Sequence, residues 1–415
     1  MKILSISTLD IWSWGKGKGI PSVFASQKGF VERGHEVHFI CPLKKKDMAQ
    51  KENYEGIHIF RFKLPFNLST VKALSMQKNT IFKHICVIIY YNLEWLFFQI
   101  LGIYWLWKFA SRIKPDLIYV HSLTPAFFAW FISKLFKTRL VIRMYGVKDL
   151  YWRWGDIFYR IKEARNYAAF KIPADYFIIT NDGTNGYQLA KKLGVCEDKI
   201  KNWRNGIDHD LYEQDPSAKE CICSYLKLKP SCKIIASTCR LISCYGVDEL
   251  LHAFADLHKK NPDTVCLIAG SGPEKKKLEE FVQKVGISSR VFFLGIVGRQ
   301  RIKKILNAAD IFVLLSRHHN CTNTMWEAMT CGKCIITTET EAIKDILTSN
   351  VDAVLVHPEA FEKIPGILDS LLSDEQCRRR LGENARLRAR QVLEPWPQRI
   401  EKEAELLEDL VKESR

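Results

Sequence analysis

The sequence has few of the residues that mark fibrous, disordered or low-complexity proteins. Its 415 residues include only 22 glycines and 14 prolines, which excludes collagen-like and low-complexity chains. Hydrophobic residues make up 47% of the chain and charged residues 26%, as in ordinary globular proteins. A chain of this length is expected to form two or three folded, mostly soluble domains.

Disulfide frameworks and zinc-ligand spacings are also missing. The 13 cysteines are odd in number and scattered, and many lie in apolar runs, which fits buried reduced thiols. Cys331 and Cys334 form a C-x-x-C pair, but no second pair or nearby histidine completes a zinc set, so packing explains them better. The initial KILSIST segment is too short for a signal peptide and predicts a strand. We therefore expect a cytoplasmic protein.

Acidic residues are scarce in the first half of the chain. Residues 1–200 carry 30 Lys and Arg against 15 Asp and Glu, whereas residues 201–415 carry 32 against 31. Eight of the 11 tryptophans lie before residue 155. Basic charge combined with interfacial aromatics predicts contact with an anionic membrane surface. Nucleic acid would attract the same charge, but no zinc-finger spacing, aromatic RNA-binding signature or long basic helix is present, so no nucleic-acid partner is expected.

The apolar segment Val87–Trp107 leaves three structures open. It is about as long as one bilayer crossing requires, and its strongly polar residues are Asn92, Glu94 and Gln99. Glu94 is costly in lipid, and the flanking basic residues show no clear asymmetry. A buried helix, or a helix that dips one face into a membrane, is therefore favoured over a spanning helix. Ala126–Lys137, which mixes Phe and Trp with Lys, is a second candidate for an interfacial helix.

Short apolar β-branched runs alternate with amphipathic helices from end to end, which predicts an α/β fold with parallel sheets. The first series of strands is Lys2–Ser7, Val37–Cys41, Ile57–Phe62, Leu117–His121, Leu140–Met144 and Tyr176–Thr180. The second is Lys233–Ser237, Val265–Ala269, Val291–Leu294, Ile311–Leu315, Cys334–Thr337 and Ala353–Val356. Two series predict two Rossmann-like domains, joined in the polar stretch between Asn205 and Pro230. A final helix is predicted at about Pro397–Lys412.

Glycine-rich loops follow two of these strands. GKGKG, at Gly15–Gly19, precedes a helix predicted over Pro21–Arg33, and GSGPE, at Gly270–Glu274, opens another helix. Both patterns allow backbone amides to approach a phosphate at a helix N-terminus. A flexible surface loop explains the first pattern equally well, and a tight turn explains the second. The G-x-G-x-G spacing and the position of Glu36 before the second strand disfavour an NAD-dependent oxidoreductase.

Three polar features are expected at the carboxyl edge of the second sheet. Arg240 closes one strand and suits bidentate contact with phosphate oxygens, although a lone arginine is more often solvated or ion-paired. Asn320, Asn323 and Thr324 precede a helix, where caps and backbone amides favour an anion; capping alone also explains them. Glu327, one turn inside that helix, can accept two vicinal ribose hydroxyls, and capping does not explain a carboxylate in the apolar WEAM turn.

The second half of the chain resembles the family 4 glycosyltransferases, retaining enzymes of the GT-B fold in which two Rossmann-like domains face a cleft. The resemblance rests on CRLISCYGVDELLHAFADL, CLIAGSGPEKKKLEEF, VFFLGIVGRQRIKKILNAADIFVLLS and NCTNTMWEAMTCGKCIITT, joined by RNGIDHDLY. PDLIYVHS, LVIRMYG and YFIITND resemble the first domain of the family, and VLEPWPQRIEKEAELLEDL resembles its closing helix. The resemblance implies an acceptor-side domain over 1–206, a donor-binding domain over 207–395, and a closing helix over 396–415 that crosses back to the first domain.

The resemblance also implies a role for each residue that matches a family motif. Arg240 would bind the donor diphosphate and Glu327 the ribose hydroxyls, while His121 and Tyr145 are candidates for positioning the acceptor in catalysis. The other donor-site candidates are Gly17, Gly19, Tyr245, Gly272, His319, Asn320, Cys321, Thr322, Asn323 and Thr324. In this fold basic residues and a helix N-terminus neutralise the leaving diphosphate, so neither a metal nor another cofactor is expected.

The chain departs from the family's motifs at several positions. Tyr245 stands where a lysine usually follows the phosphate-binding arginine, and His319 replaces the first acid of the E-x7-E motif. Asn320 and Asn323 instead match the N-x-x-N of some relatives, and Tyr145 stands where many members have a histidine. These changes indicate either an altered donor or a subunit without activity.

The sequence therefore predicts a metal-independent, retaining hexosyltransferase. Its donor would be a nucleotide-sugar and its acceptor a lipid-linked, saccharide or other membrane-presented molecule, in the synthesis of a cell-surface polysaccharide or glycolipid. We expect it to associate peripherally with the inner face of the membrane. The alternative is a catalytically inactive glycosyltransferase-like subunit that acts through a partner protein. The sugar, the base and the acceptor depend on pocket shape, which the sequence does not define.

Overall fold

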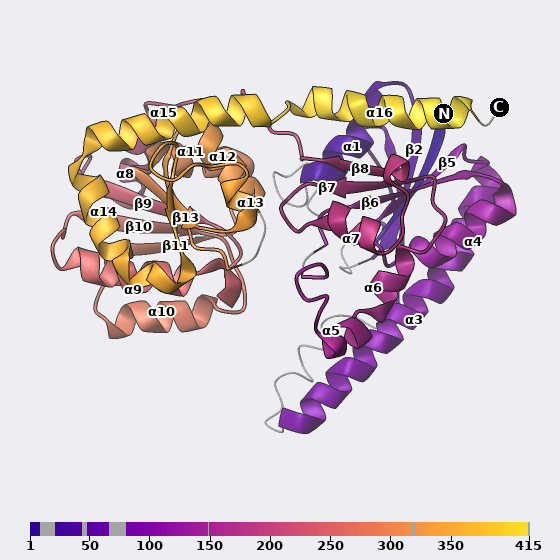
Figure 1. The fold of residues 1–415 in the computed structure, drawn as a ribbon, viewed down its shortest axis with the longest axis horizontal. Coiled ribbons are helices and arrows are strands. Elements are labelled where there is room, and N and C mark those ends of the chain that lie inside the picture. Colours follow the sequence, from indigo (N-terminus) through magenta and orange to yellow (C-terminus); the bar gives the residue numbers. More distant parts are fainter. Residues whose placement is uncertain (9–20, 44–47, 66–79, 148, 318–320, 414–415) are drawn as a thin grey trace.

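The computed structural model describes residues 1–8, 21–43, 48–65, 80–147, 149–317 and 321–413, with the backbone alone at 21 and 80–91. The chain forms two α/β domains that lie side by side, and its last two helices run along both of them (Figure 1). This is the α/β architecture predicted from the sequence, with one mainly parallel sheet in each domain.

The first domain is built on an eight-stranded sheet of order β3-β4-β2-β1-β5-β6-β7-β8. All neighbours are parallel except β3 and β4. The strands are β1 (Lys2–Ser7), β2 (Glu36–Pro42), β3 (Lys51–Tyr54), β4 (Ile57–Phe62), β5 (Leu117–His121), β6 (Arg139–Met144), β7 (Tyr176–Thr180) and β8 (Ile200–Trp203).

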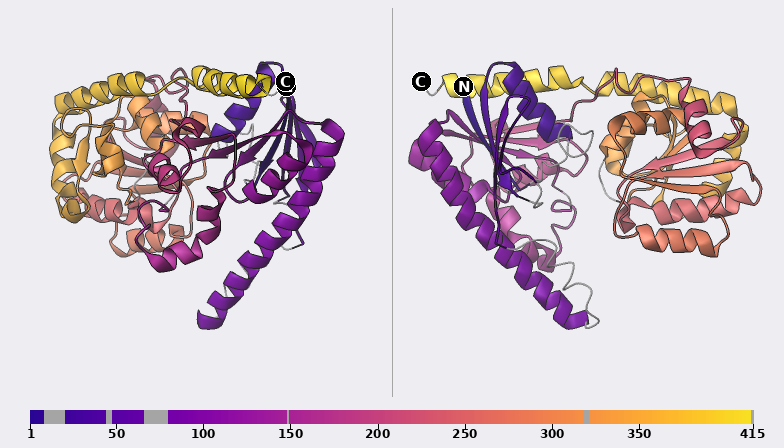
Figure 2. Two further views of the ribbon diagram at one scale, coloured as in Figure 1. Left: turned by 45° about the vertical axis from the view of Figure 1, so that its right-hand side comes forward. Right: turned by 180° about the vertical axis from the view of Figure 1, so that it is seen from behind.

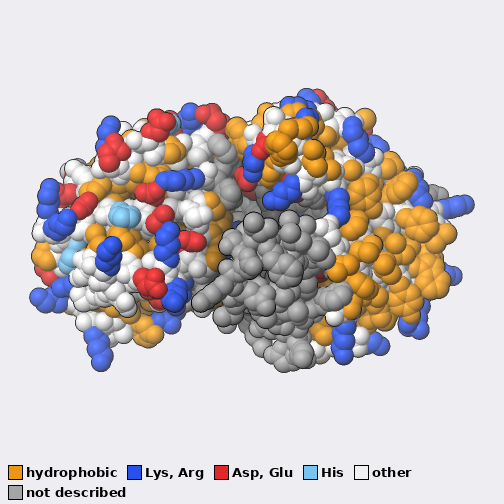
Figure 3. Space-filling view, turned by 90° about the horizontal axis from the view of Figure 1, so that it is seen from below, with side chains coloured by type: hydrophobic (Ala, Val, Ile, Leu, Met, Phe, Trp, Pro, Cys, Tyr) orange, Lys and Arg blue, Asp and Glu red, His pale blue; other side chains and the backbone are white. Residues whose placement is uncertain are grey.

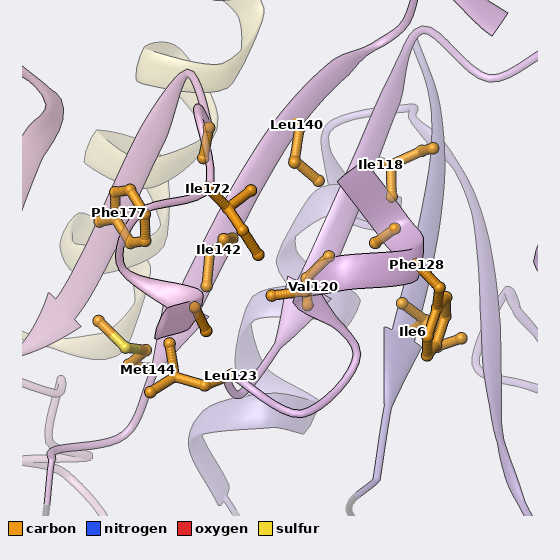
Figure 4. Close-up of a cluster of buried hydrophobic side chains, with 14 of the residues drawn as sticks. Ile6, Ile118, Val120, Leu123, Phe128, Leu140, Ile142, Met144, Ile172 and Phe177 are labelled. Carbon is orange, nitrogen blue, oxygen red and sulfur yellow. The ribbon is translucent and has the colours of Figure 1, made fainter. Parts of the chain in front are cut away.

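Helices cover both faces of this sheet (Figure 2). One face packs against α1 (Pro21–Glu32) and α16 (Trp396–Lys412), and the other against α3 (Thr80–Ile113), α4 (Ala126–Phe136), α6 (Ala164–Ala169) and α7 (Gly186–Lys192). In Figure 4, Ile6, Val120 and Ile142 from three adjacent strands form a row, with Phe128 of α4 beside Ile6. Because both faces are covered and alternate residues point to opposite faces, apolar residues occupy most positions of the central strands β5, β6 and β7.

The second domain has a six-stranded sheet of order β11-β10-β9-β12-β13-β14, the doubly wound arrangement of a Rossmann-like domain. Its strands are β9 (Lys233–Thr238), β10 (Thr264–Ala269), β11 (Val291–Gly295), β12 (Ile311–Leu314), β13 (Cys334–Thr338) and β14 (Val354–Val356). The longer helices around it are α8 (Ala218–Leu226), α9 (Val247–His258), α10 (Lys275–Lys284), α11 (Arg299–Ala308), α12 (Asn323–Thr330), α14 (Ile364–Ser373) and α15 (Glu375–Val392).

Two strands are not predicted by the sequence pattern. β3, with the sequence KENY, is polar and exposed, and it forms only because it pairs with β4. β8 is a short edge strand whose pairing with β7 decides its conformation. The bounds of the other twelve strands differ from the predicted ones by at most one residue at either end, because those strands carry strong apolar runs.

The apolar segment around residues 87–107 lies within α3, a helix of 34 residues. Phe98 and Leu106 are buried against the first sheet, whereas Ile100, Ile103 and Trp107 are exposed. None of the helices in the described part of the chain has an apolar stretch of the length and purity that a bilayer crossing needs.

The chain passes twice between the domains, and the two passages are hydrogen-bonded to each other. The Ile207 N–H donates to the Glu394 carbonyl (3.1 Å), and the Trp396 N–H donates to the Ile207 carbonyl (3.2 Å). A Cβ atom on Gly206 would lie 2.7 Å from Trp396 Cα, so only glycine allows this close approach. The segment that leaves β8 and the segment that enters α16 therefore form one connection.

A cluster of buried ion pairs joins α16 to the first sheet. The Glu403 carboxylate lies 2.7 Å from Arg399 Nη2 and 3.7 Å from Arg143 Nε, and it accepts a hydrogen bond from the Tyr119 hydroxyl. All three charged residues are 1% exposed. Burial alone would raise the pKa of Glu403, but the two guanidinium groups hold this pKa below its usual value. Arg399 Nε also donates to the Arg204 carbonyl (3.0 Å), which ties the cluster to the interdomain connection.

Replacing Glu403 with glutamine should lower the free energy of unfolding by about 3–5 kcal/mol, because two buried guanidinium groups then lose their counter-charge. The measurement is chemical denaturation followed by near-UV circular dichroism. Glu401→Gln is the matched control: Glu401 lies 3.8 Å from Arg33 in an exposed pair on the same helix, and its loss should change stability by less than about 1 kcal/mol. Equal effects of the two substitutions would contradict the role assigned to the cluster.

Candidate functional site

Loops at the carboxyl ends of the strands of both sheets meet where the domains join. The Cys321 N–H, just before α12, donates to the carbonyl of Asp182 in the loop after β7 (2.7 Å). Asn205, which follows β8, donates from Nδ2 to Oδ1 of Asn323, the first residue of α12 (3.4 Å). The junction therefore places the loops after β7 and β8 directly against the N-terminus of α12.

Arg240 lies at the point where ligands usually bind an open α/β sheet. It follows β9, and β9 and β12 are the adjacent strands at which the connections of the second sheet change direction. Its side chain is exposed, and its guanidinium lies 6.0 Å from the centre of the Tyr245 ring. An exposed guanidinium at this edge can contact an anionic ligand through two parallel N–H groups.

The loops after β9 and β10 pack backbone against backbone beside Arg240. A Cβ atom on Gly272 would lie 2.1 Å from the Leu241 carbonyl oxygen, and one on Gly270, with φ +150°, would lie 1.8 Å from the Cys239 carbonyl oxygen. The Leu241 N–H donates to the Ser271 carbonyl (3.1 Å). Gly272 thus supports the Arg240 loop through close packing.

The N-terminus of α12 is the second cationic element of the site. Thr322 occupies the N-cap position, but its hydroxyl is hydrogen-bonded to the Thr324 hydroxyl (2.8 Å) and does not cap the helix. The side chains of Thr322, Asn323 and Thr324 are half-buried at this junction. Unpaired N–H groups of a first helical turn carry a partial positive charge that favours an anion.

Glu327 lies one turn inside α12 and has a specific partner. The Tyr212 hydroxyl donates to Glu327 Oε1 (2.7 Å), and the Tyr212 ring is fully buried. Burial raises the pKa of Glu327 to about 7, against the opposing effects of the Tyr212 hydrogen bond and of nearby Arg299. The side chain keeps partial solvent access. Glu327 is therefore a carboxylate that a ligand with hydroxyl groups can meet near neutral pH.

His121 and Tyr145 form a pair at the carboxyl ends of β5 and β6. His121 Nδ1 and the Tyr145 hydroxyl share a hydrogen bond of 2.7 Å, and the two rings are parallel. His121 is fully buried, and burial lowers its pKa to about 3, so the imidazole is neutral at physiological pH. Tyr145 is only half-buried. His121 thus orients Tyr145, and of the two only Tyr145 has a surface that a ligand can reach.

The remaining predicted residues fall into two groups. The Tyr245 ring and the Cys321 side chain are buried in the apolar cluster that surrounds α12, so neither side chain points outward. Gly17, Gly19, His319 and Asn320 lie outside the described residues.

Sequence reasoning did not assign a role to Tyr212, Asn205 or Asp182. Tyr212 and Asn205 both lie in the RNGIDHDLY motif, which marks the domain junction, but their contacts with α12 come from the tertiary structure. Asp182 contributes a backbone carbonyl, which no sequence pattern can indicate. Among the described side chains, no cluster of three or more His, Cys, Asp or Glu is arranged to hold a metal ion.

Two family models match this chain. Residues 226–388 match the model for glycosyl transferases group 1, and residues 23–211 match the model for Glycosyltransferase Family 4. The first match contains Arg240 and α12, and the second contains His121, Tyr145 and Asn205. Together the two models cover most of both domains, and Tyr212 lies just outside them, between the two matched ranges.

Relatives of known sequence or structure agree with these models over most of the chain. An uncharacterised glycosyltransferase of Methanocaldococcus jannaschii is 24% identical over 369 residues, 86% of each chain. A sucrose-phosphate synthase from Thermosynechococcus elongatus superimposes with a TM-score of 0.76 at 16% identity, covering 99% of this chain and 98% of that one. HepE of Anabaena, solved in complex with UDP-glucose, superimposes with a TM-score of 0.72 at 17% identity, covering 99% of this chain and 100% of that one. The chain belongs to the family 4 glycosyltransferases and is a transferase of the GT-B fold.

Proposed function

We propose that this glycosyltransferase transfers a sugar, with retention of anomeric configuration, from a nucleotide-sugar to a lipid-linked or other membrane-presented acceptor. The synthesis of a cell-surface polysaccharide or glycolipid is the process it would serve. The observation that carries the proposal is the convergence of Arg240, the N-terminus of α12 and Glu327 on the carboxyl edge of the second sheet. One nucleoside diphosphate presents the two anionic groups and the vicinal hydroxyls that these elements suit.

In this proposal the donor binds across the carboxyl ends of β9 and β12 in the second sheet. Arg240 contacts the diphosphate, the α12 amides face its distal phosphate, and the ionised Glu327 accepts hydrogen bonds from the ribose hydroxyls. HepE, a structural neighbour, was solved with UDP-glucose, which supports a nucleotide-sugar as the ligand class. These cationic groups neutralise the diphosphate, so the proposed transfer requires no metal.

The proposed transfer occurs on one face of the donor sugar. The bond between the anomeric carbon and the phosphate oxygen breaks as the acceptor oxygen bonds to the same carbon. The proton of the acceptor hydroxyl passes to the departing phosphate oxygen. Arg240 and the α12 amides stabilise the negative charge that develops on this phosphate. Tyr145, oriented by the neutral His121, positions the acceptor from the first domain.

The acceptor class is supported by a hydrophobic surface on the first domain. Figure 3 shows broad hydrophobic areas there, on the side where Figure 1 places α3 and α4. Twelve large apolar side chains of the described residues are exposed on α3, on α4 and on the short helix α5 (Ile157–Lys162). They are Leu93, Leu96, Ile100, Ile103, Tyr104, Trp107, Trp130, Phe131, Leu135, Ile157, Phe158 and Ile161. Exposed apolar surface of this extent typically marks a contact with a membrane or another protein.

The spacing of the apolar residues on α3 and the basic residues around them favour a membrane as the partner of this surface. On α3, residues Leu93, Leu96, Ile100, Ile103 and Trp107 follow a repeat of three and four, which places them on one face of the helix. Exposed basic residues accompany this face and the neighbouring helices: Arg112, Lys114, Lys134, Lys137, Lys162 and Arg165. An apolar face with basic neighbours suits the interface of an anionic bilayer. We propose peripheral attachment of the first domain to the cytoplasmic face of a membrane.

Replacing Arg240 with alanine should weaken the binding of a nucleoside diphosphate about tenfold to hundredfold, because a charge-assisted contact with phosphate is lost. Saturation-transfer NMR with UDP, GDP and ADP identifies the nucleotide, and calorimetry then gives the affinity. Arg379→Ala is the control, since Arg379 is an exposed residue of α15 that pairs with Glu375. Folded wild-type protein that binds none of the three nucleotides would refute the donor site and support the inactive-subunit alternative.

The affinity for this nucleotide should rise about tenfold between pH 6 and pH 8. Glu327, with a pKa near 7, is mostly protonated at pH 6 and mostly ionised at pH 8, and the ionised form is the better acceptor for ribose hydroxyls. Glu327→Gln should remove this part of the pH dependence while keeping the titration of the nucleotide's own phosphate. The same pH profile in wild type and variant would show that Glu327 does not contact the ligand.

The protein should co-sediment with vesicles containing phosphatidylglycerol, and less with vesicles of phosphatidylcholine alone. The double substitution Ile100→Glu and Phe131→Glu should reduce this binding at least tenfold, because it introduces charges into the apolar face. Val351→Glu with Leu387→Glu adds the same charge to exposed apolar positions of the second domain and should change binding less than twofold. Wild-type protein that remains in the supernatant with anionic vesicles at moderate salt would exclude this mode of attachment.

A further inference from the structure

Asn205 makes hydrogen bonds to both domains from a single side chain. Its Oδ1 atom accepts from Arg143 Nη2 (3.3 Å) and from the Thr180 hydroxyl (3.4 Å), both in the first domain. Its Nδ2 atom donates to Asn323 Oδ1 (3.4 Å), in the second domain. Asn205 also follows directly after Arg204, whose carbonyl accepts from Arg399 of α16. The side chain therefore lies between the buried ion cluster and the N-terminus of α12.

The orientation of the Asn205 amide is set by chemistry. A guanidinium group only donates hydrogen bonds, so it must face the oxygen of Asn205. Arg143 cannot turn away, because it is 1% exposed, lies beside Glu403, and donates from Nη1 to the Met144 carbonyl (3.3 Å). The NH2 group of Asn205 consequently points toward Asn323.

The orientation of the Asn323 amide follows from that of Asn205. The NH2 group of Asn205 only donates, so Asn323 must present its oxygen to it. The NH2 group of Asn323 is then directed away from Asn205, at the first residue of α12 and on a half-buried side chain. An N–H donor in this place adds to the anion-binding character of the helix N-terminus, whereas a carbonyl oxygen in the same place would repel an anion.

We propose that Asn205 is a positioning residue for the donor: held by Arg143, it orients Asn323 so that Asn323 Nδ2 donates to the distal phosphate of the nucleoside diphosphate. This inference rests on the proposed function: it gives Asn323, already a donor-site candidate, a specific contact and adds Asn205 as the residue that orients it. It also assigns a role to α16, which reaches the donor through Glu403, Arg143 and Asn205 without touching it.

The first test compares two nucleotides on one variant. Asn205→Asp keeps an oxygen for Arg143 and Thr180 but removes the NH2 group that faces Asn323. The two ligands are whichever of UDP, GDP and ADP the wild type binds and the monophosphate of the same nucleoside. The variant should bind the diphosphate about tenfold or more weakly, bind the monophosphate within twofold of wild type, and keep the wild-type melting temperature. Asn202→Asp, on the edge strand β8, controls for the added charge and should leave both affinities within twofold.

The second test asks whether Asn205 acts through Asn323. Asn205→Ala should weaken diphosphate binding in the wild-type background but have no further effect in an Asn323→Ala background, because the group that it orients is gone. If Asn205 had a purely structural role, Asn205→Ala would cause the same loss of diphosphate affinity in both backgrounds. It would also weaken monophosphate binding as much as diphosphate binding. Either result overturns the inference. Wild-type protein that binds no nucleotide refutes the proposed function itself, and the inference falls with it. Wild-type binding with an unaffected Asn205→Asp variant refutes the inference alone.

Discussion

The buried carboxylate of Glu403 is the constraint on which the meeting of the two domains depends. A carboxylate removed from water is stable only when it is paired, and Glu403 has two guanidinium partners, one from β6 and one from α16. Because Arg399 also holds the carbonyl of Arg204, the same cluster fixes the segment through which the chain leaves the first sheet. The contact of Asn205 with the start of α12 is built on this connection.

The two domains bring different chemistry to their junction. The second domain offers positive charge at the ends of β9 and β12 and one carboxylate, Glu327, whose pKa lies near neutrality. The first domain offers a hydrogen-bonded pair whose histidine is neutral, since burial holds the pKa of His121 far below its ordinary value. A neutral, enclosed imidazole orients its neighbour and does not exchange protons with a ligand. This division fits a transfer in which the departing phosphate itself receives the acceptor's proton.

Local sequence signals predict most of the fold and part of the candidate site. The apolar runs of β1 and of β9 to β13 are recognisable in the sequence. Arg240 is a candidate because of its place at the carboxyl end of a strand, and Glu327 because a carboxylate is unusual in an apolar helical turn. β3 and β8 carry no such signal, since their partners in the sheet decide their conformation. Tyr212 and Asn205 act on residues 115 and 118 positions further along the chain. Such roles arise only when the two domains are brought together.

Hydrogen exchange with and without a bound nucleoside diphosphate tests most directly whether the donor lies across the ends of β9, β10 and β12. The account predicts slower exchange of backbone amides in residues 239–246, 270–274 and 321–327, with α3 and α4 unchanged. Protection confined to the carboxyl ends of β5 and β6 would contradict it, as would binding that leaves the start of α12 unprotected.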